Sequence, residues 1–425
     1  MKKVLLIIFL ICSNFSLLIY GQLTIEDCYE KARENYPQIK QYKLIEQSKE
    51  YSLTNASRGY LPQLSLSLKA TYQSEVTEIP ISLPGVNIPT INHDQYQAVA
   101  EVNQMIWDGG AIKSQKKRIE AEHNVEEKQF EIDLYALRER IIDLFFGVLL
   151  FEEQLVLNDI YNNELKANQG KIIGSMQNGM ANQSDLDIIN VEILNTSQRK
   201  TELEALCKAY ADMLAYFTGK LPEEGIRLIK PEVSFDNFEI TGHESGNLRP
   251  EIAFYEANTS LLEVQKAGVS ANNLPKISAF LQGGYGNPGL NMLKEGFRSY
   301  AIGGLKLNWN FGALYTRKND LRKINNSIEK INTQKEVFHF NSRIKAIRQQ
   351  NEADKYRTII HDDIEIIKLR ENIKKASEAK TENGIMTMND LVRDISAVQM
   401  ARQNKAIHEI EMMKSIYQLK NILNK

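Results

Sequence analysis

Four short stretches of the chain alternate between apolar and polar residues. Residues 65–72 place leucine, alanine and tyrosine at one set of alternate positions, and serine, lysine and threonine at the other. Residues 96–103 alternate in the same way except at Val99, and the same period recurs at 277–281 and 301–309. A two-residue period is typical of a strand with one apolar and one polar face. The pattern therefore predicts four strands, arranged in two pairs.

Each predicted strand pair is connected by a turn-rich loop. The first loop contains three prolines between residues 80 and 89, and the second runs from Gly286 to Phe297. Residues 284–289 read Gly-Tyr-Gly-Asn-Pro-Gly, which fits the glycine fingerprint of dinucleotide-binding proteins by letter. Because this segment opens no helix and leads into another strand, we interpret it as a hairpin loop.

Outside the strands, apolar residues recur at intervals of three and four, which predicts helices. One long helix is expected from Ala111 to about Ser175, with a sustained heptad seam and a length of roughly 95 Å. A second, Ala313 to Asn383, contains neither proline nor glycine. Helices about half as long are expected at Thr24 to Ser57, Ser184 to Phe217 and Asn389 to Ile422. Two short helices stacked end to end would match one long helix, which suggests the wall of a tall cylinder.

The order of these elements occurs twice. The landmarks that repeat are Pro37 and Pro62 with Pro250 and Pro275, Trp107-Asp-Gly-Gly110 with Trp309-Asn-Phe-Gly312, and Asn178–Leu186 with Asn383–Leu391. A repeated order at near-equal spacing indicates two copies of one unit. The expected organisation is a signal peptide at 1–21, repeat one at 22–218, a linker or equatorial segment at 219–246 and repeat two at 247–425.

The first residues predict export. Lys2 and Lys3 precede a short apolar run that ends near Gly21, the layout of a cleavable signal peptide. Cys12 follows the bulky Ile11, which argues against lipid attachment at that cysteine. After Gly21 no apolar run approaches the 20 or so residues of a membrane-spanning helix.

Composition and candidate chemistry exclude several functions. Of the 52 basic residues, two lie in the signal, which leaves 50 against 54 acidic residues and argues against a nucleic-acid partner. We find no catalytic constellation, no phosphate-binding loop and no cofactor motif, and therefore expect no enzyme and no cofactor. Six histidines are scattered without metal-ligand spacing, namely His93, His123, His243, His339, His361 and His408. Cys28 and Cys207 are interpreted as core residues, although a disulfide between them stays open.

Four strands cannot close a barrel, because small barrels need about eight. An open four-stranded sheet with one apolar face would also leave unpaired edges. The sequence therefore predicts self-association. Two chains would supply eight strands and three would supply twelve, and the spacing alone does not choose between them.

The doubled unit, the Leu-Pro strand starts, the Trp-Asp-Gly-Gly strand exit and the paired Asn-Gly…Asp-Leu turns resemble the TolC family of outer-membrane efflux proteins. The similarity covers Leu23 to Asn424. The resemblance implies a mostly α-helical protein with a membrane β-barrel, formed as a homotrimer with twelve strands in outer-membrane lipid. It further implies a helical tunnel that extends into the periplasm and docks to a periplasmic adaptor protein and, through it, to an inner-membrane pump. The chain would then be the passive exit duct of an efflux or type I secretion system.

The two turns between helices are the first candidate sites. Their predicted functional residues are Gly179, Asp185 and Leu186 in the first turn, and Gly384, Asp390 and Leu391 in the second. A glycine lets a helix reverse, and a carboxylate satisfies free N–H groups at the start of the next helix. Simple capping explains this pattern, and the resemblance adds a docking role at the periplasmic mouth. Gate residues are positional guesses only, at Ser175, Gln177, Glu378 and Glu382.

Two further groups of side chains leave alternatives open. Four methionines near the turns could hold a soft metal ion or provide adaptable packing, namely Met176, Met180, Met386 and Met388. Trp107, Tyr300 and Trp309 near strand ends predict an interfacial aromatic belt, with packing at the sheet–helix junction as the alternative for the two tryptophans. The rival to a channel is a periplasmic coiled-coil scaffold or adaptor without a pore. The exported substrate and the class of pump are not fixed by the sequence.

Overall fold

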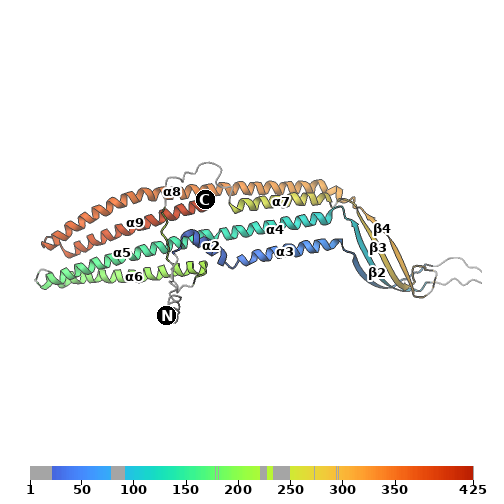
Figure 1. The fold of residues 1–425 in the computed structure, drawn as a ribbon, viewed down its shortest axis with the longest axis horizontal. Helices are drawn as coiled ribbons and strands as arrows, with labels where there is room; N and C mark the ends of the chain where they lie inside the picture. Colours follow the sequence, from blue (N-terminus) through green and yellow to red (C-terminus); the bar gives the residue numbers. More distant parts are fainter. Residues whose placement is uncertain are drawn as a thin grey trace, which may run out of the picture. The chain divides into compact units, whose positions relative to one another are not determined.

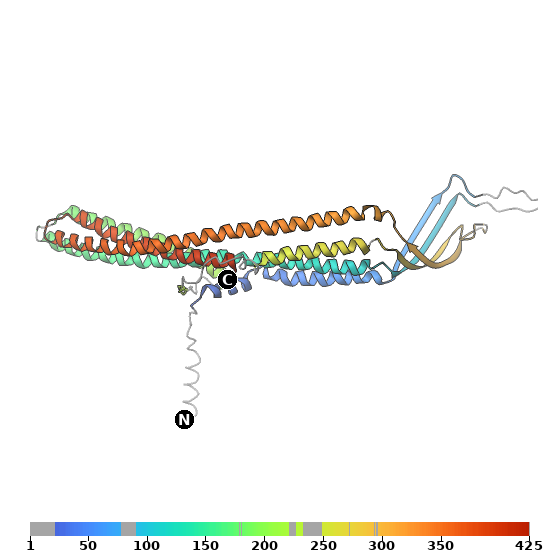
Figure 2. The same ribbon diagram turned by 90° about the horizontal axis from the view of Figure 1, so that it is seen from above.

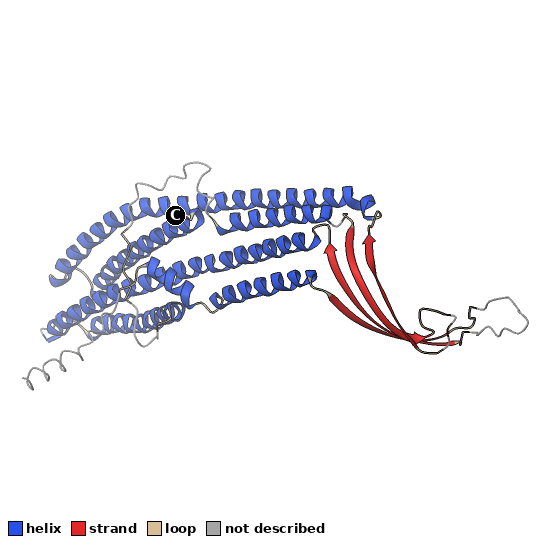
Figure 3. Ribbon diagram, turned by 45° about the vertical axis from the view of Figure 1, so that its right-hand side comes forward, coloured by secondary structure: helices blue, strands red, loops and turns tan. Residues whose placement is uncertain are grey.

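The computed structural model describes residues 22–77, 91–177, 179, 181–220, 227–232, 249–271, 273–292, 294 and 296–424. The predicted signal peptide, the proline-containing loop and most of the predicted linker lie outside the described residues. The described part is mostly helical with one antiparallel sheet, as predicted (Figures 1 and 3). Its elements are α2 (Ile25–Asn35), α3 (Ile39–Ser57), η1 (Arg58–Tyr60), β1 (Gln63–Tyr72), β2 (Asp94–Trp107), α4 (Ala111–Tyr135), α5 (Leu137–Gln177), α6 (Gln183–Thr218), α7 (Pro250–Ala271), β3 (Lys276–Asn287), β4 (Arg298–Asn308), α8 (Ala313–Glu382) and α9 (Met388–Leu423).

The chain divides into two compact units. Unit 1 comprises Met1–Ile39, Glu131–Pro250 and Val337–Lys425, and unit 2 comprises Lys40–Phe130 and Glu251–Glu336. Each unit therefore takes residues from both predicted repeats. Among the described residues, no helix is both long enough and apolar enough to cross a membrane.

Unit 2 contains the sheet, in which the strands follow the order β1-β2-β3-β4. Every neighbouring pair is antiparallel, and one row across the sheet joins Leu66 to Ala100, Ala100 to Gly283 and Gly283 to Ala301. Because the register holds the alternating residues of all four strands in phase, the apolar positions share one face. β1 pairs only with β2, and β4 only with β3, so both outer edges are unpaired within the described residues.

Unit 1 has two apolar clusters. The larger one joins α2, α5, α6 and α9 around Phe145 and Phe146, which are fully buried. The smaller one joins α5, α6 and α9 near the ends of the helices, around Leu165, Ile172 and Ile395. Figures 1 and 2 both draw α5 beside α6 and α8 beside α9, which gives two helical hairpins.

Three sequence predictions need correction. The helix expected from Thr24 to Ser57 is broken between Asn35 and Ile39, because Pro37 lacks an N–H group and restricts the residue before it. The helix expected from Ala111 is interrupted at Ala136, where the amide still donates to the Ile132 carbonyl at 3.0 Å.

The third correction concerns the glycine-rich segment that was expected to be a loop. Gly284 and Gly286 lie inside β3, which continues to Asn287 and pairs with strands on both sides. Gly284 is required there because the ring of Tyr300 on β4 covers it. A Cβ atom on Gly284 would lie 2.1 Å from Tyr300 Cζ.

Candidate functional site: the sheet face and the helical turns

One face of the sheet is apolar and exposed. Leu66 is 72% exposed on β1 and Leu305 is 74% exposed on β4, values that are high for leucine. The other large apolar side chains of this face, all exposed, are Leu64, Leu68, Tyr72, Tyr96, Val102, Leu281, Tyr285 and Leu307. A contiguous apolar surface of this kind marks a site of contact with lipid or protein.

Aromatic residues lie at both ends of this face. Trp107 and Trp309 lie at the end nearest the helices, where β2 and β4 finish, and Trp309 Nε1 donates to the Asn273 carbonyl at 3.1 Å. At the opposite end Phe297 contacts the rings of Tyr96 and Tyr285, with centroids 6.3 and 5.5 Å apart. The sequence reading missed this second group. The alternation of apolar and polar residues could have identified this group, because it places Tyr96 and Tyr285 on the apolar face.

Tyr300 does not join the two tryptophans. Its register partner is Gly284, which places it on the polar face of the sheet. Gln97 on that face donates its amide to the Tyr300 hydroxyl at 2.5 Å. Val99, the exception to the alternation, lies on the same face in register with Gly284 and is buried. The predicted belt of three residues is therefore divided between two faces.

Otherwise the second face of the sheet is polar and carries an excess of positive charge. The charged residues in register on this face are Lys69, Glu101, Lys276, Arg298 and Lys306. On β1 and β2, serine and glutamine occupy most of the remaining positions, as the alternation predicts, whereas β3 and β4 also place Phe280 and Ile302 on this face. This face is suited to contact with water.

The strand exits of the two repeats share a capping device that the sequence reading did not identify. Asp108, a buried residue, accepts from the Gly110 and Ile112 amides at 2.8 and 2.6 Å at the start of α4. Asn310 accepts from the Gly312 amide at 3.0 Å at the start of α8. This device could have been predicted from the sequence, because both copies have an acidic or amide residue at the same position and such residues are preferred as helix N-caps.

The first helical turn contains the predicted residues in a capping arrangement. Gly179 has φ of 73°, a left-handed conformation that glycine adopts without strain. Asn182 Oδ1 accepts from the Asp185 amide at 3.1 Å, and Asp185 Oδ2 accepts from the Asn182 amide at 3.0 Å. Two amides at the start of α6 are thereby satisfied. Leu186 packs against the smaller apolar cluster.

The second turn is built in the same way with different residues. Gly384 has φ of 68°, and Thr387 Oγ1 accepts from the Asp390 amide at 3.3 Å and donates to Asp390 Oδ2 at 2.7 Å. Arg393 also pairs with Asp390 at 3.2 Å. Leu391 is buried in the smaller cluster. Both predicted leucines therefore fix the turns to the helices beneath them.

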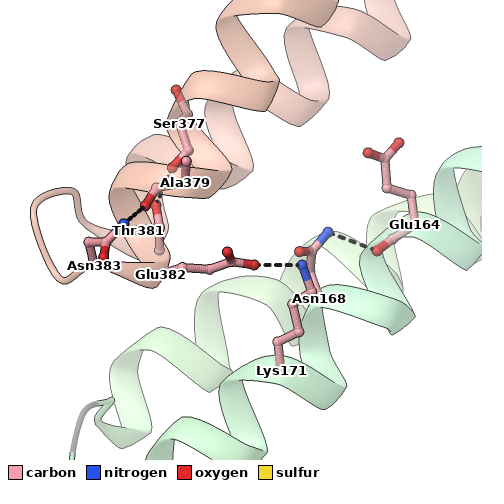
Figure 4. Close-up of polar contacts among 8 residues, drawn as sticks. All are labelled: Glu164, Asn168, Lys171, Ser377, Ala379, Thr381, Glu382 and Asn383. Carbon is pink, nitrogen blue, oxygen red and sulfur yellow. Dashed lines mark hydrogen bonds and ion pairs between the residues drawn. The ribbon is translucent and has the colours of Figure 1, made fainter.

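Close to the turns, α8 is joined to α5 by two ion pairs. Lys171 Nζ lies 3.1 Å from Glu382 Oε1, with both side chains more than half exposed (Figure 4). Lys374 Nζ lies 2.6 Å from Glu164 Oε1, and these side chains are only 18% and 22% exposed. Glu382 was one of the positional guesses for a gate residue. Lys171, Glu164 and Lys374 were not identified from the sequence, because sequence spacing does not indicate which helices are neighbours.

The sulfur-containing residues have mainly packing environments. Met176 and Met388 pack against the smaller apolar cluster, and Met180 lies outside the described residues. Cys28 and Cys207 are both free thiols. Burial raises the pKa of Cys28 to about 12 and also raises that of Cys207. Within the described part of the chain, no three histidine, cysteine or acidic side chains converge on a possible metal site.

Several solved structures of outer-membrane proteins share this architecture. VceC, an outer membrane protein of Vibrio cholerae, superposes with a TM-score of 0.66 at 11% identity, covering 94% of this chain and 95% of that chain. The CmeC outer membrane channel of Campylobacter jejuni gives 0.64 at 12% identity, covering 94% and 85%. The MtrE outer membrane channel of Neisseria gonorrhoeae, in its open state, gives 0.65 at 11% identity, covering 94% and 88%. No protein-family model and no curated protein matches the sequence. The chain therefore has the fold of outer-membrane channel proteins, the fold that the resemblance to the TolC family implies.

Proposed function

We propose that this chain is a subunit of a TolC-like outer-membrane channel, a passive exit duct for efflux or type I secretion. The observation that carries the proposal is the continuous, exposed apolar face of a four-stranded sheet, both edges of which are unpaired among the residues that the structure describes. Water does not stabilise such a face, and lipid does not tolerate such edges. Copies of the chain that pair β1 of one with β4 of the next satisfy both requirements.

The dimensions of the apolar face fit a lipid bilayer. Tyr96 and Trp107 are eleven residues apart on β2, which corresponds to roughly 35 Å of strand. A strand tilted by about 40° spans about 27 Å along the membrane normal, close to the apolar band of about 25 Å in outer-membrane barrels. Aromatic residues at both ends of this span match the two interfaces of a membrane.

In this proposal three chains form a twelve-stranded barrel, whose polar face lines the pore. The helices continue the duct into the periplasm, where an adaptor protein and an inner-membrane pump supply energy and select the substrate. The exposed apolar residues of α8, which include Phe340, Ile344 and Leu369, are suited to packing between subunits. The number of subunits and the partners come from the resemblance to the TolC family.

Adjacent residues of β1 provide the sharpest test. Leu66 lies on the apolar face and Ser67 on the polar face, in the middle of the same strand. Leu66→Arg should cost about 2–4 kcal/mol per chain in a bilayer, whereas Ser67→Arg should be tolerated. We expect the first variant to be lost from the outer-membrane fraction and the second to be inserted and to conduct ions in a planar bilayer. Equal insertion of the two variants would contradict the proposal.

We further propose that the two turns form the periplasmic mouth and dock the adaptor. The capping arrangements at Asp185 and Asp390 hold the turns in one conformation, so Asp185→Ala or Asp390→Ala should loosen the mouth and raise single-channel conductance. Asp187→Ala is a matched control, because Asp187 lies two residues farther along α6 and, within the described part of the chain, accepts from the Gln183 side chain at 2.8 Å and caps no amide. Unchanged conductance in both capping variants would argue against gating at the turns.

The alternative, a periplasmic scaffold or adaptor without a pore, predicts different behaviour on extraction. Such a protein would be recovered in the soluble periplasmic fraction. An adaptor would also need only one helical hairpin, whereas this chain has two hairpins and four strands that form a single sheet. We therefore favour the channel.

A further inference from the structure

A cavity of about 780 Å³ lies in unit 2, where the helices meet the sheet. It is bounded by the first turns of α4 and α8 and by the last turns of α7. The helices are held close there, since a Cβ atom on Gly268 of α7 would lie 3.0 Å from Ser114 Oγ of α4. Arg317 of α8 donates to Ser270 Oγ of α7 at 3.5 Å. The cavity is thus a groove over α7, flanked by α4 and α8.

The walls of this groove change in polarity along its length. Next to the sheet they are apolar, with Leu274, Trp309 and Leu314. Farther along the helices they carry three cationic side chains, Lys113 and Lys117 of α4 and Arg317 of α8. Floor positions on α7 are mostly small or apolar, including Val264, Ala267 and Ala271.

The positive charge of the groove is not neutralised by the chain itself. Its single acidic lining residue, Glu263, already pairs with Lys266 at 3.3 Å. Lys113 and Lys117 form no ion pair with any residue in the described part of the chain. The groove therefore combines an apolar end with an unneutralised cationic end, which is the complement of an anionic amphiphile.

We propose that this groove binds an anionic phospholipid, with the phosphate at Lys113, Lys117 and Arg317 and an acyl chain against the wall at Trp309. The proposal rests on the proposed function, in which the apolar face of the sheet lies in the membrane. Lys113 and Arg317 are the third and fifth residues of their helices, so they lie within about 10 Å of the strand ends. That is the depth of the headgroup layer, where indole rings also reside. Clustered cations at this depth attract anionic lipids.

Native mass spectrometry of the detergent-solubilised full chain tests the proposal. The probes are phosphatidylglycerol and phosphatidylcholine with identical acyl chains. We expect phosphatidylglycerol to bind more tightly, and the triple variant Lys113→Gln, Lys117→Gln, Arg317→Gln to lose this preference with about tenfold weaker binding. The matched control is Lys116→Gln, Lys318→Gln, Arg322→Gln, which removes the same number of charges from α4 and α8 outside the groove.

A second variant tests the shape of the site without changing its charge. Ala267→Trp places an indole on the floor of the groove and should reduce phosphatidylglycerol binding while retaining the helical circular-dichroism spectrum. Equal binding of the two lipids overturns the proposal, as does an equal loss in the control triple variant. Displacement by inorganic phosphate alone would identify a free-anion site instead. Lipid binding that occurs only after the oligomer dissociates would identify a second copy as the occupant.

Channel conductance separates this inference from the proposed function. A wild-type oligomer that conducts ions without preferring phosphatidylglycerol contradicts only the lipid site. A protein that binds the anionic lipid in the groove but neither oligomerises nor conducts contradicts the channel proposal.

Discussion

The long helix α8 of the second repeat corresponds in the sequence to α4 and α5 of the first, and α5 and α8 have different surroundings. Fourteen residues of α5 are buried, among them Phe145, Phe146 and Ile141. Only four residues of α8 are buried, and they are alanines or polar residues, namely Ala346, Ala353, Asp363 and Ser377. The large apolar side chains of α8 face outward, including Phe340, Ile344, Ile347, Ile366, Leu369 and Ile373.

The contacts that hold the two helices also differ in kind. Apolar packing fixes α5 against α2, α6 and α9. Within unit 1, α8 is attached mainly by polar contacts, as in the pairs Arg402–Glu371 at 2.7 Å and Ser377–Asp394 at 2.6 Å. Interlocked apolar side chains resist displacement, whereas a partly exposed polar contact such as Arg402–Glu371 exchanges readily with water. The Ser377–Asp394 contact is buried and is the more durable of the two. The comparison indicates that α5 belongs to a fixed core. In the proposed channel, α8 would gain its apolar partners from another chain and would be the helix able to move.

The largest expected difference is between two phenylalanines of these helices. Phe145 in α5 is fully buried and Phe340 in α8 is 67% exposed. Phe145→Ala should lower the free energy of unfolding by about 3–5 kcal/mol because it leaves a cavity. Phe340→Ala should change it by less than about 1 kcal/mol and should instead weaken the oligomer. Urea denaturation followed by circular dichroism measures the first effect, and size-exclusion chromatography with light scattering measures the second. Equal destabilisation by the two substitutions would remove the distinction between the helices.

A glycine in α5 sharpens the comparison between the hairpins. A Cβ atom on Gly147 would lie 2.3 Å from Tyr210 Cδ1 of α6, whereas one on Gly170 would meet nothing within 4 Å. Gly147→Ala should therefore destabilise the chain by about 1–3 kcal/mol. The control Gly170→Ala, in the same helix, should stabilise it by up to about 1 kcal/mol. Thermal denaturation of both variants is the measurement, and Tyr210→Ser should rescue Gly147→Ala. No glycine occurs in α8, so close approach of this kind is restricted to the first hairpin.

The two ion pairs between α8 and α5 should differ in importance. Lys374–Glu164 is largely shielded from water and Lys171–Glu382 is mostly exposed. Lys374→Gln should weaken the attachment of α8 by about 1–2 kcal/mol and raise conductance, whereas Lys171→Gln should have an effect below about 1 kcal/mol. Planar-bilayer recordings give the conductance. A larger effect of Lys171→Gln would indicate that the exposed ion pair beside the loop, and not the shielded pair farther along the helices, controls the conductance.

The sequence was most informative where one local rule determines the structure. Strand faces follow from the alternation at Leu66 and Ser67. The turn glycines were identifiable for the same reason, since Gly179 and Gly384 adopt a conformation that other residues avoid.

Features that depend on contacts between distant segments were not predictable. The position of Tyr300 above Gly284 requires the register of β3 and β4, and the pairing of Glu164 with Lys374 requires the neighbouring of α5 and α8. The break at Pro37 is a different case, because the local rule was available and the apolar period of the helix outweighed it in the sequence reading. The groove at Lys113 combines residues from three helices, and no single stretch of sequence indicates it.

The smallest expected effect concerns how the stability of the folded chain depends on pH through Glu152, at the interface between α5 and α6. Burial raises the pKa of Glu152 in α5, and the charge of Glu152 contributes, after burial, to the raised pKa of Cys207 in α6. A carboxyl whose pKa is raised on folding destabilises the folded chain when it is ionised, so the penalty is present at neutral pH and disappears as the pH falls below the ordinary glutamate value. Glu152→Gln should therefore raise stability slightly at pH 7 and have no such effect in mild acid.

The same substitution has a second readout that stability alone does not provide. Removal of the nearby negative charge should lower the pKa of Cys207 and speed its reaction with a maleimide at a fixed pH, because the thiolate is the reactive form. Cys28 is the internal control, since its thiol lies in the larger apolar cluster around α2 and does not depend on Glu152. Mass spectrometry of the labelled chain resolves the two cysteines. If the rate at Cys207 stays constant while stability rises, Glu152 acts through packing and its charge does not reach α6.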